Sequence, residues 1–212
     1  MSGGQMKKIL LMGPQGAGKG TVASILKDKL NIPHISMGDI FRETSKSNTP
    51  LGEKLRAIMK SGELVPLEIT AQMLKERLSR DDCKKGYLLD GYPRNIEQAE
   101  VLDKIEKIDK VVVLTVPREI AIERLTTRIQ CKKCGAVFNI KTMPPKKEGI
   151  CDYCGGELYR REDDTEEAIN KRLEIYEKET KPLIERYKDK VIIIDTSKQK
   201  VEEVVETILK SL

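Results

Sequence analysis

The sequence has no tryptophan and a single histidine, and only 4% of its 212 residues are aromatic. A catalytic mechanism built on several histidines is therefore excluded. His34, the single histidine, lies inside a predicted strand and is expected to be structural. Modules that bind nucleic acid by stacking bases on aromatic rings are disfavoured for the same reason.

Long apolar runs are also absent, since no stretch approaches the ~18 residues of a membrane-spanning helix. The first residues, MSGGQ, lack the apolar region of a secretory signal. We therefore expect no membrane association and a cytoplasmic location. Disulfides are rare in that compartment, so clustered cysteines there indicate metal binding or chemistry.

Charge of one sign does not dominate: 39 Lys and Arg face 34 Asp and Glu, for a net charge of +5. This excess is too small to indicate nucleic-acid binding by itself, because that function needs basic residues clustered on one face. The length fits one domain, with room for small insertions.

Short apolar runs alternate with helical patterns along the chain. Strands are predicted at residues 7–13, 32–36, 86–93, 110–117 and 190–197, and helices at 18–30, 51–61, 67–80, 95–107, 117–129, 165–188 and 201–212. Most of the strands are continuously apolar, which is typical of a parallel sheet covered by helices on both faces. Two long segments, 37–85 and 130–160, interrupt this order and are expected to form lids or binding loops.

A phosphate-binding loop is predicted at residues 13–19, GPQGAGK, between the first strand and the first helix. In such loops backbone N–H groups surround a phosphate at a helix N-terminus, and the lysine, here Lys19, reaches the transferred group. Gly20 stands where many of these loops carry a magnesium-binding hydroxyl. Magnesium must then be held by phosphates, waters and a distant carboxylate, for which Asp90 at the end of the third strand is a candidate. A turn-forming role in DGYP is the alternative for Asp90.

Several arginines indicate more than one phosphate group to neutralise. Arg124 and Arg128 are four apart in a predicted helix, so they share a face, and neither has an acidic residue three or four positions away. A bound anion or a solvated helix face accounts for this pair.

A second group of arginines is Arg94, which follows the third strand directly, and Arg161 and Arg172, around the segment RREDD. In that segment Asp164 is expected to cap the next helix together with Glu167.

Four of the five cysteines form two C-x-x-C pairs, Cys131 with Cys134 and Cys151 with Cys154, separated by sixteen residues. This spacing is typical of a zinc ribbon, in which four thiolates hold a structural Zn²⁺ and leave no position open for catalysis. A redox pair is the alternative. Cys83 stands apart and is expected to be a free thiol.

The stretches GPQGAGKGT, GDIFR, SGELVP, LLDGYPRNIEQAE, RLTTR, RREDD and KRLEIY, in this order, resemble the nucleoside monophosphate kinases. The closest resemblance is to adenylate kinases of the long-lid, zinc-binding type, over essentially the whole chain from Met6. It implies an α/β P-loop fold of three layers around a five-stranded parallel sheet. It also implies Mg²⁺-dependent transfer from ATP to AMP, giving two ADP. A monomer is expected, with self-association as the alternative. The implied parts are a core (6–36, 67–129 and 162–212), a monophosphate-binding domain (37–66) and a lid (130–161).

The same resemblance implies the roles of individual residues. ATP-binding residues are expected to be Gly16, Ala17, Gly18, Lys19, Gly20, Thr21, Arg124, Arg128, Val137, Phe138 and Lys198. AMP-binding residues are expected to be Met37, Arg42, Glu63, Leu64, Val65, Gly91, Tyr92, Pro93, Arg94, Gln98, Arg161 and Arg172. Catalysis is expected from Lys19, Asp90, Arg94, Arg128, Arg161 and Arg172.

Met37 is a departure from the family pattern, because relatives usually read ISTGD where this chain reads ISMGD. Loss of that hydroxyl leaves base selectivity open, so a kinase with broader donor or acceptor specificity is the first alternative. The second is a zinc-ribbon protein that uses ATP as a switch on nucleic acid, for which we expect a steep salt dependence of oligonucleotide binding. This second alternative leaves Arg42, Arg94 and Gln98 unexplained.

Overall fold

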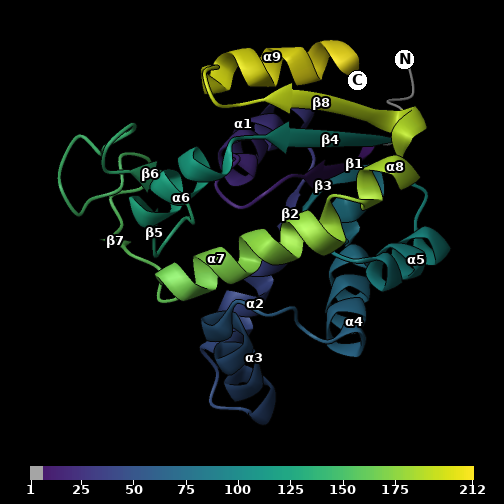
Figure 1. Ribbon diagram of the computed structural model, residues 1–212, viewed down its shortest axis with the longest axis horizontal. Coiled ribbons are helices and arrows are strands. Elements are labelled where there is room, and N and C mark those ends of the chain that lie inside the picture. The colour runs from purple at the N-terminus through teal and green to yellow at the C-terminus, as the bar shows by residue number, and fades with distance from the viewer. Residues whose placement is uncertain (1–6) are drawn as a thin grey trace.

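The computed structural model describes residues 7–212, and its centre is a five-stranded parallel sheet with the order β2-β3-β1-β4-β8 (Figure 1). The strands are β1 (Lys7–Met12), β2 (His34–Ser36), β3 (Gly86–Asp90), β4 (Lys110–Thr115) and β8 (Val191–Asp195). The predicted α/β class and parallel sheet are confirmed. Met6, where the resemblance begins, lies outside the described residues.

Helices cover both faces of the sheet, so alternate side chains of β1 enter two different cores. Ile9 and Leu11 pack with α1 (Lys19–Leu30) and α9 (Val201–Ser211). Leu10 and Met12 pack on the opposite face, with residues of α4 (Leu67–Leu78), α5 (Ile96–Ile105) and α8 (Leu183–Arg186). Burial on both faces explains why the strands read as continuous apolar runs.

Two insertions extend from this core in Figure 1. The first contains α2 (Met37–Ser45) and α3 (Pro50–Ser61). The second contains a small antiparallel sheet of β5 (Arg128–Cys131), β6 (Val137–Asn139) and β7 (Leu158–Tyr159), in the order β6-β5-β7. The predicted helix list omitted α2 and the sequence pattern gave no signal for the three strands.

Two predicted helices are shorter than expected. The helix predicted over 117–129 is α6 (Arg118–Thr126), so Arg128 belongs to β5 and does not share a helix face with Arg124. The helix predicted over 165–188 is α7 (Glu166–Ile175), followed by a π-helical turn (Tyr176–Thr180) and α8. Pro182, which has no backbone N–H, lies between the π turn and α8 and interrupts the regular hydrogen bonding.

Among the described residues, no helix combines the length and the apolar character that crossing a bilayer requires.

Candidate active site

A cleft of about 1090 Å³ opens at the carboxyl ends of β1, β2 and β3, where parallel α/β sheets bind ligands. Small-molecule sites are typically ~300–1,000 Å³, so this cleft has room for more than one small ligand. Most of the predicted site residues line it: Gly16, Ala17, Gly18, Lys19, Gly20, Thr21, Arg42, Glu63, Leu64, Val65, Asp90, Gly91, Tyr92, Arg94, Gln98, Arg124, Arg128, Val137, Phe138, Arg161 and Arg172.

Three predicted site residues are not among those that line the cleft. Met37 is fully buried in the core beside β3, and neither Pro93 nor Lys198 is among the residues that line the cleft. The residues after Lys198, Gln199 and Lys200, do line it.

The phosphate loop folds tightly because its glycines adopt backbone angles and contacts that other residues cannot. A Cβ on Gly13 would lie 2.1 Å from the carbonyl oxygen of Leu114, and Gly18 caps α1 in the left-handed conformation, with φ of 87°. The ammonium group of Lys19 donates to the carbonyl oxygens of Gly13 and Pro14, each at 2.8 Å. Burial, with smaller contributions from Arg94 and Arg128, lowers the pKa of Lys19 to about 8, despite the opposing charge of Asp90.

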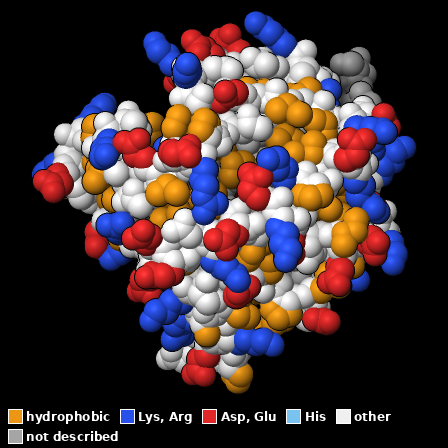
Figure 2. Space-filling view, in the orientation of Figure 1, with side chains coloured by type: hydrophobic (Ala, Val, Ile, Leu, Met, Phe, Trp, Pro, Cys, Tyr) orange, Lys and Arg blue, Asp and Glu red, His pale blue; other side chains and the backbone are white. Residues whose placement is uncertain are grey.

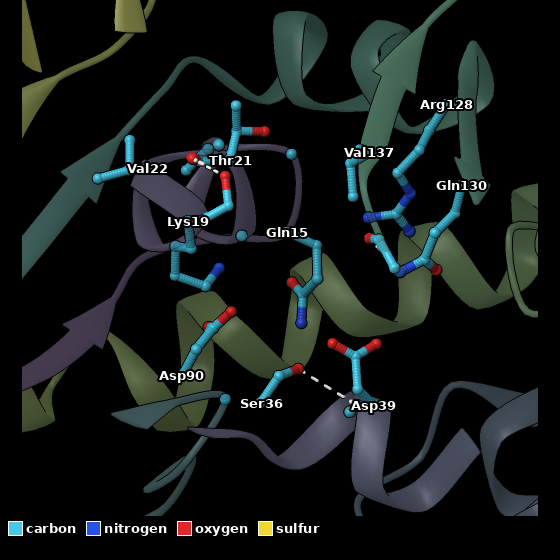
Figure 3. Close-up of a pocket in the computed structure, with 18 of the residues that line it drawn as sticks. Gln15, Lys19, Thr21, Val22, Ser36, Asp39, Asp90, Arg128, Gln130 and Val137 are labelled. Atoms are coloured by element: carbon cyan, nitrogen blue, oxygen red, sulfur yellow. Dashed lines mark hydrogen bonds between the residues drawn. The ribbon is translucent and has the colours of Figure 1, made fainter. Parts of the chain in front are cut away.

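Asp90 points toward Lys19 from the end of β3 (Figure 3). Burial by itself would raise the pKa of this carboxyl, but His34 and Lys19 outweigh that effect and hold it below its usual value. The Nε2 atom of His34 lies 3.7 Å from Oδ2 of Asp90, so the single histidine is part of the cleft wall. An ionised carboxylate therefore stands next to the phosphate loop.

Carboxylates hold two of the cleft arginines through contacts that sequence reasoning missed. Asp164 accepts two hydrogen bonds from Arg128, at 2.9 and 2.6 Å, and one from Arg172 at 3.0 Å. The prediction that Asp164 caps the next helix is wrong, because Thr165 is the N-cap and accepts from the backbone N–H of Ala168. Asp164 is a partner of arginines instead.

Other cleft arginines have partners within their own helix or on distant segments. Asp39 accepts from Arg42 at 2.5 Å, while Arg124 donates to the carbonyl oxygen of Thr196 at 2.7 Å. Arg161 donates to the side chain of Gln130 at 2.5 Å. Burial and the charges of nearby arginines lower the pKa of Arg161 to about 9. Positive charge is therefore concentrated in this part of the cleft, which favours binding of an anion.

Asp39, Gln130, Asp163 and Thr196 are among the polar residues that line the cleft and that sequence reasoning did not assign to it. Asp164 is not a lining residue, but it bonds to two arginines that are. The acidic residues do adjoin arginines in GDIFR and RREDD, and that adjacency was the available signal. Gln15 also points into the cleft, and its amide oxygen is buried without a hydrogen-bond partner among the described residues (Figure 3).

The four paired cysteines converge in the second insertion, with all four Sγ atoms within 4.8 Å of one another. The Sγ atoms of Cys131 and Cys154 are 3.5 Å apart, and those of Cys134 and Cys151 are 3.6 Å apart. Four sulfurs around a tetrahedral Zn²⁺ at ~2.3 Å stand about 3.8 Å from one another, so the cluster fits this ion. Burial opposes ionisation of Cys131, but backbone N–H groups of Cys134 and Lys133 outweigh it and lower the pKa of this thiol.

A glycine-rich loop before a helix, a lysine folded over it, an adjacent carboxylate and a ring of arginines define a P-loop enzyme that transfers phosphoryl groups between nucleotides. The first insertion and the cysteine-bearing second insertion close the two sides of its cleft. This combination is the architecture of a nucleotide kinase.

Comparison with known proteins gives the family. The family model described as Adenylate kinase matches residues 11–192. The chain is 51% identical over 213 residues to the adenylate kinase of Caldicellulosiruptor saccharolyticus and 49% identical over 211 residues to that of Caldicellulosiruptor bescii, covering 97% of this chain and 98% of each relative. It is 49% identical over 201 residues to the adenylate kinase of Clostridium tetani, covering 92% of this chain and 93% of the relative. The chain belongs to the adenylate kinase family, and the predicted family and enzyme class are confirmed.

Proposed function

We propose that the protein catalyses reversible, Mg²⁺-dependent phosphoryl transfer from ATP to AMP, giving two ADP, and so maintains the balance of adenine nucleotides. The observation that carries this proposal is the convergence of Lys19, Asp90 and the arginines on one cleft large enough for two nucleotides. No observation favours the alternatives with other bases or with nucleic acid.

The donor nucleotide lies along the phosphate loop in this proposal. Residues 16–21 supply N–H donors to the phosphates of ATP, and Arg124 and Arg128 neutralise them from the lid side of the cleft. Val137 faces the cleft from β6 and packs against the adenine, with Lys198 near the donor base. Phe138 lies mostly in the small core around the cysteines and supports Val137 from there.

The acceptor monophosphate lies between the first insertion and the loop after β3. Arg42 and Arg94 bind its phosphate, and Gln98 with the loop residues around it contacts the base. The remaining members of this set are Glu63, Leu64, Val65, Gly91, Tyr92, Pro93, Arg161 and Arg172. Met37 stands directly behind the set, in the core.

Catalysis in this cleft is positioning and charge stabilisation, because phosphoryl transfer asks little of acid–base groups. Lys19, Arg128, Arg161 and Arg172 stabilise charge on the transferred group, while Arg94 holds the attacking phosphate. Closure of the lid (130–161) and the monophosphate-binding domain (37–66) on the core (6–36, 67–129 and 162–212) excludes water that would otherwise hydrolyse ATP.

Two metals complete the proposal. Asp90 would orient the waters of Mg²⁺ bound with ATP, since Gly20 provides no hydroxyl, and the ion would supply neutralisation of the phosphate charge. Zn²⁺ is held by Cys131, Cys134, Cys151 and Cys154 and folds the lid, with no ligand position left for chemistry.

We further propose that the enzyme works in the cytoplasm as a monomer, without nucleic acid or membrane. Lys and Arg are interspersed with Asp and Glu over the face shown in Figure 2, which supports the absence of a nucleic-acid surface there. Light scattering tests the monomer.

The decisive experiment is a coupled assay of nucleoside diphosphate formation with pairs of ATP or GTP and AMP, GMP, CMP or UMP. ATP with AMP should give the highest kcat/KM. Arg94→Ala should raise KM for AMP and Arg124→Ala should raise KM for ATP, which separates the two sites. Equal rates with all monophosphates would contradict the proposal. So would a raised KM for ATP instead of AMP in Arg94→Ala, or for AMP instead of ATP in Arg124→Ala.

A further inference from the structure

The π-helical turn Tyr176–Thr180 ends on a threonine whose hydroxyl bonds outside its own helix. In an α-helix a threonine hydroxyl often bonds to the carbonyl oxygen four residues earlier, which for Thr180 is that of Tyr176. Here the backbone N–H of Lys181 donates to that oxygen at 2.8 Å. The hydroxyl of Thr180 has its partner outside its own helix instead, and π turns of this kind are frequent at functional sites.

That partner is Arg94, 86 positions earlier in the chain. The hydroxyl of Thr180 donates to the backbone carbonyl oxygen of Arg94 at 2.6 Å, and Thr180 is only 7% exposed. The backbone N–H of Arg94 donates to the side chain of Gln98 at 2.8 Å, and its Nε donates to the carbonyl oxygen of Gly91 at 3.0 Å. The peptide groups on both sides of Arg94 are thus held by side chains, one from α5 and one from the π turn.

Thr180 itself does not line the cleft, so it can influence a ligand there only through Arg94. Arg94 lies in the segment between β3 and α5, which has no helix or strand hydrogen bonds to fix it. Without a partner for its carbonyl oxygen, this segment can rotate and move the guanidinium. A displacement of about 1 Å at a positioning group can cost about a hundredfold in rate.

We propose that Thr180 is a positioning residue for the acceptor site, acting through the backbone of Arg94. This inference rests on the proposed role of Arg94 in binding the phosphate of AMP. It predicts an effect that is confined to the acceptor nucleotide, because the hydrogen bond does not touch the phosphate loop or the lid.

The test compares Thr180→Val, which keeps the shape and removes the hydroxyl, with Thr180→Ser, which keeps the hydroxyl. Thr180→Val should raise KM for AMP and lower kcat, with kcat/KM for AMP falling about tenfold, the effect of one buried hydrogen bond. KM for ATP should stay within about twofold, and Thr180→Ser should restore most of the loss. Thr207→Val is the matched control, because the hydroxyl of Thr207 bonds to Glu203 within α9.

Several outcomes would overturn the inference. Unchanged kinetics in a folded Thr180→Val, an equal rise of both KM values, or a Thr180→Ser variant as impaired as Thr180→Val would each do so. Loss of folding in both Thr180→Val and Thr180→Ala, seen in thermal melts, would make Thr180 a structural residue instead. The Arg94→Ala variant keeps the two proposals distinct: if it binds AMP normally, the role of Arg94 fails first, and if it does not, Thr180→Val added to it should change KM for AMP no further.

Discussion

Replacing Asp164 with asparagine should destabilise the protein far more than breaking a comparable pair on the surface. The side chain of Asp164 is 0% exposed, and its two partners, Arg128 and Arg172, are 15% and 11% exposed. Removing one member of a buried pair typically costs about 3–5 kcal/mol, because the remaining charge is left uncompensated. Since both arginines keep some contact with solvent, we expect about 3 kcal/mol. At roughly 2–4 °C per kcal/mol for a chain of this size, Tm should fall by roughly 6–12 °C.

The control is Asp82→Asn. Asp82 also accepts two hydrogen bonds from one arginine, Arg77, at 2.9 and 2.7 Å, but its side chain is 50% exposed. Exposed pairs contribute about 0–1 kcal/mol, so this variant should melt close to the native protein. Each carboxylate accepts two hydrogen bonds from one arginine, and Asp164 differs in its burial and in its second arginine, Arg172.

The dependence on pH gives an independent test of the Asp164 prediction. Burial would raise the pKa of this carboxyl, but Arg128 and Arg172 outweigh it and lower the pKa below the ordinary value of 3.8. A lowered pKa means that the stabilisation is present above the unfolded pKa and is lost as pH falls through the folded pKa. The difference in Tm between the native protein and Asp164→Asn should therefore be full at pH 7 and shrink below about pH 4. A loss no larger than that of Asp82→Asn, or one that does not change in acid, would refute the reasoning.

Four further predictions concern the phosphate loop, the lid and the acceptor site. Lys19→Met should lower kcat by about 10²–10³-fold or more, because the charge of Lys19 acts on the transition state. The variant should not lower Tm, because burial disfavours the charged lysine and lowers its pKa to about 8. A loss of kcat of less than tenfold would contradict this role. ATP binding to the native protein should take up protons near pH 8, because phosphate charge raises that pKa; calorimetry in buffers of different ionisation enthalpy measures this uptake, which should vanish in Lys19→Met. Elemental analysis should find about one Zn²⁺ per chain, and its removal should lower Tm more than it changes KM for AMP; metal-free protein with freely titratable thiols would oppose the zinc assignment. Met37→Thr should lower the free energy of unfolding by roughly 2 kcal/mol, because Met37 is 0% exposed in the core, and should leave the preference for AMP unchanged; a sharper preference would support the interpretation that Met37 loosens base discrimination.

Patterns local in the chain were sufficient for much of this protein. The alternation of apolar runs and helical segments identified a parallel α/β sheet, because burial on both faces requires apolar residues throughout a strand. The phosphate loop and the two C-x-x-C pairs could be recognised because their chemistry depends on residues within a few positions of one another. Gly13 and Gly18 could be recognised in the same way. A Cβ at Gly13 would clash with the backbone of Leu114, and the left-handed backbone of Gly18 would be strained with any other residue.

Contacts between distant segments could only be decided by the tertiary structure. Arg128 meets Asp164 36 positions later, and Thr180 meets Arg94 86 positions earlier, because packing of the lid strand and the π turn against the core brings them together. The periodicity of the sequence does not predict such pairings. The same holds for the end of α6 at Thr126, because Arg128 belongs to β5, a strand of the lid sheet. Burial of Met37 follows from the way α2 packs on the sheet, and the sequence alone gave no sign that this side chain lies in the core behind the expected acceptor site.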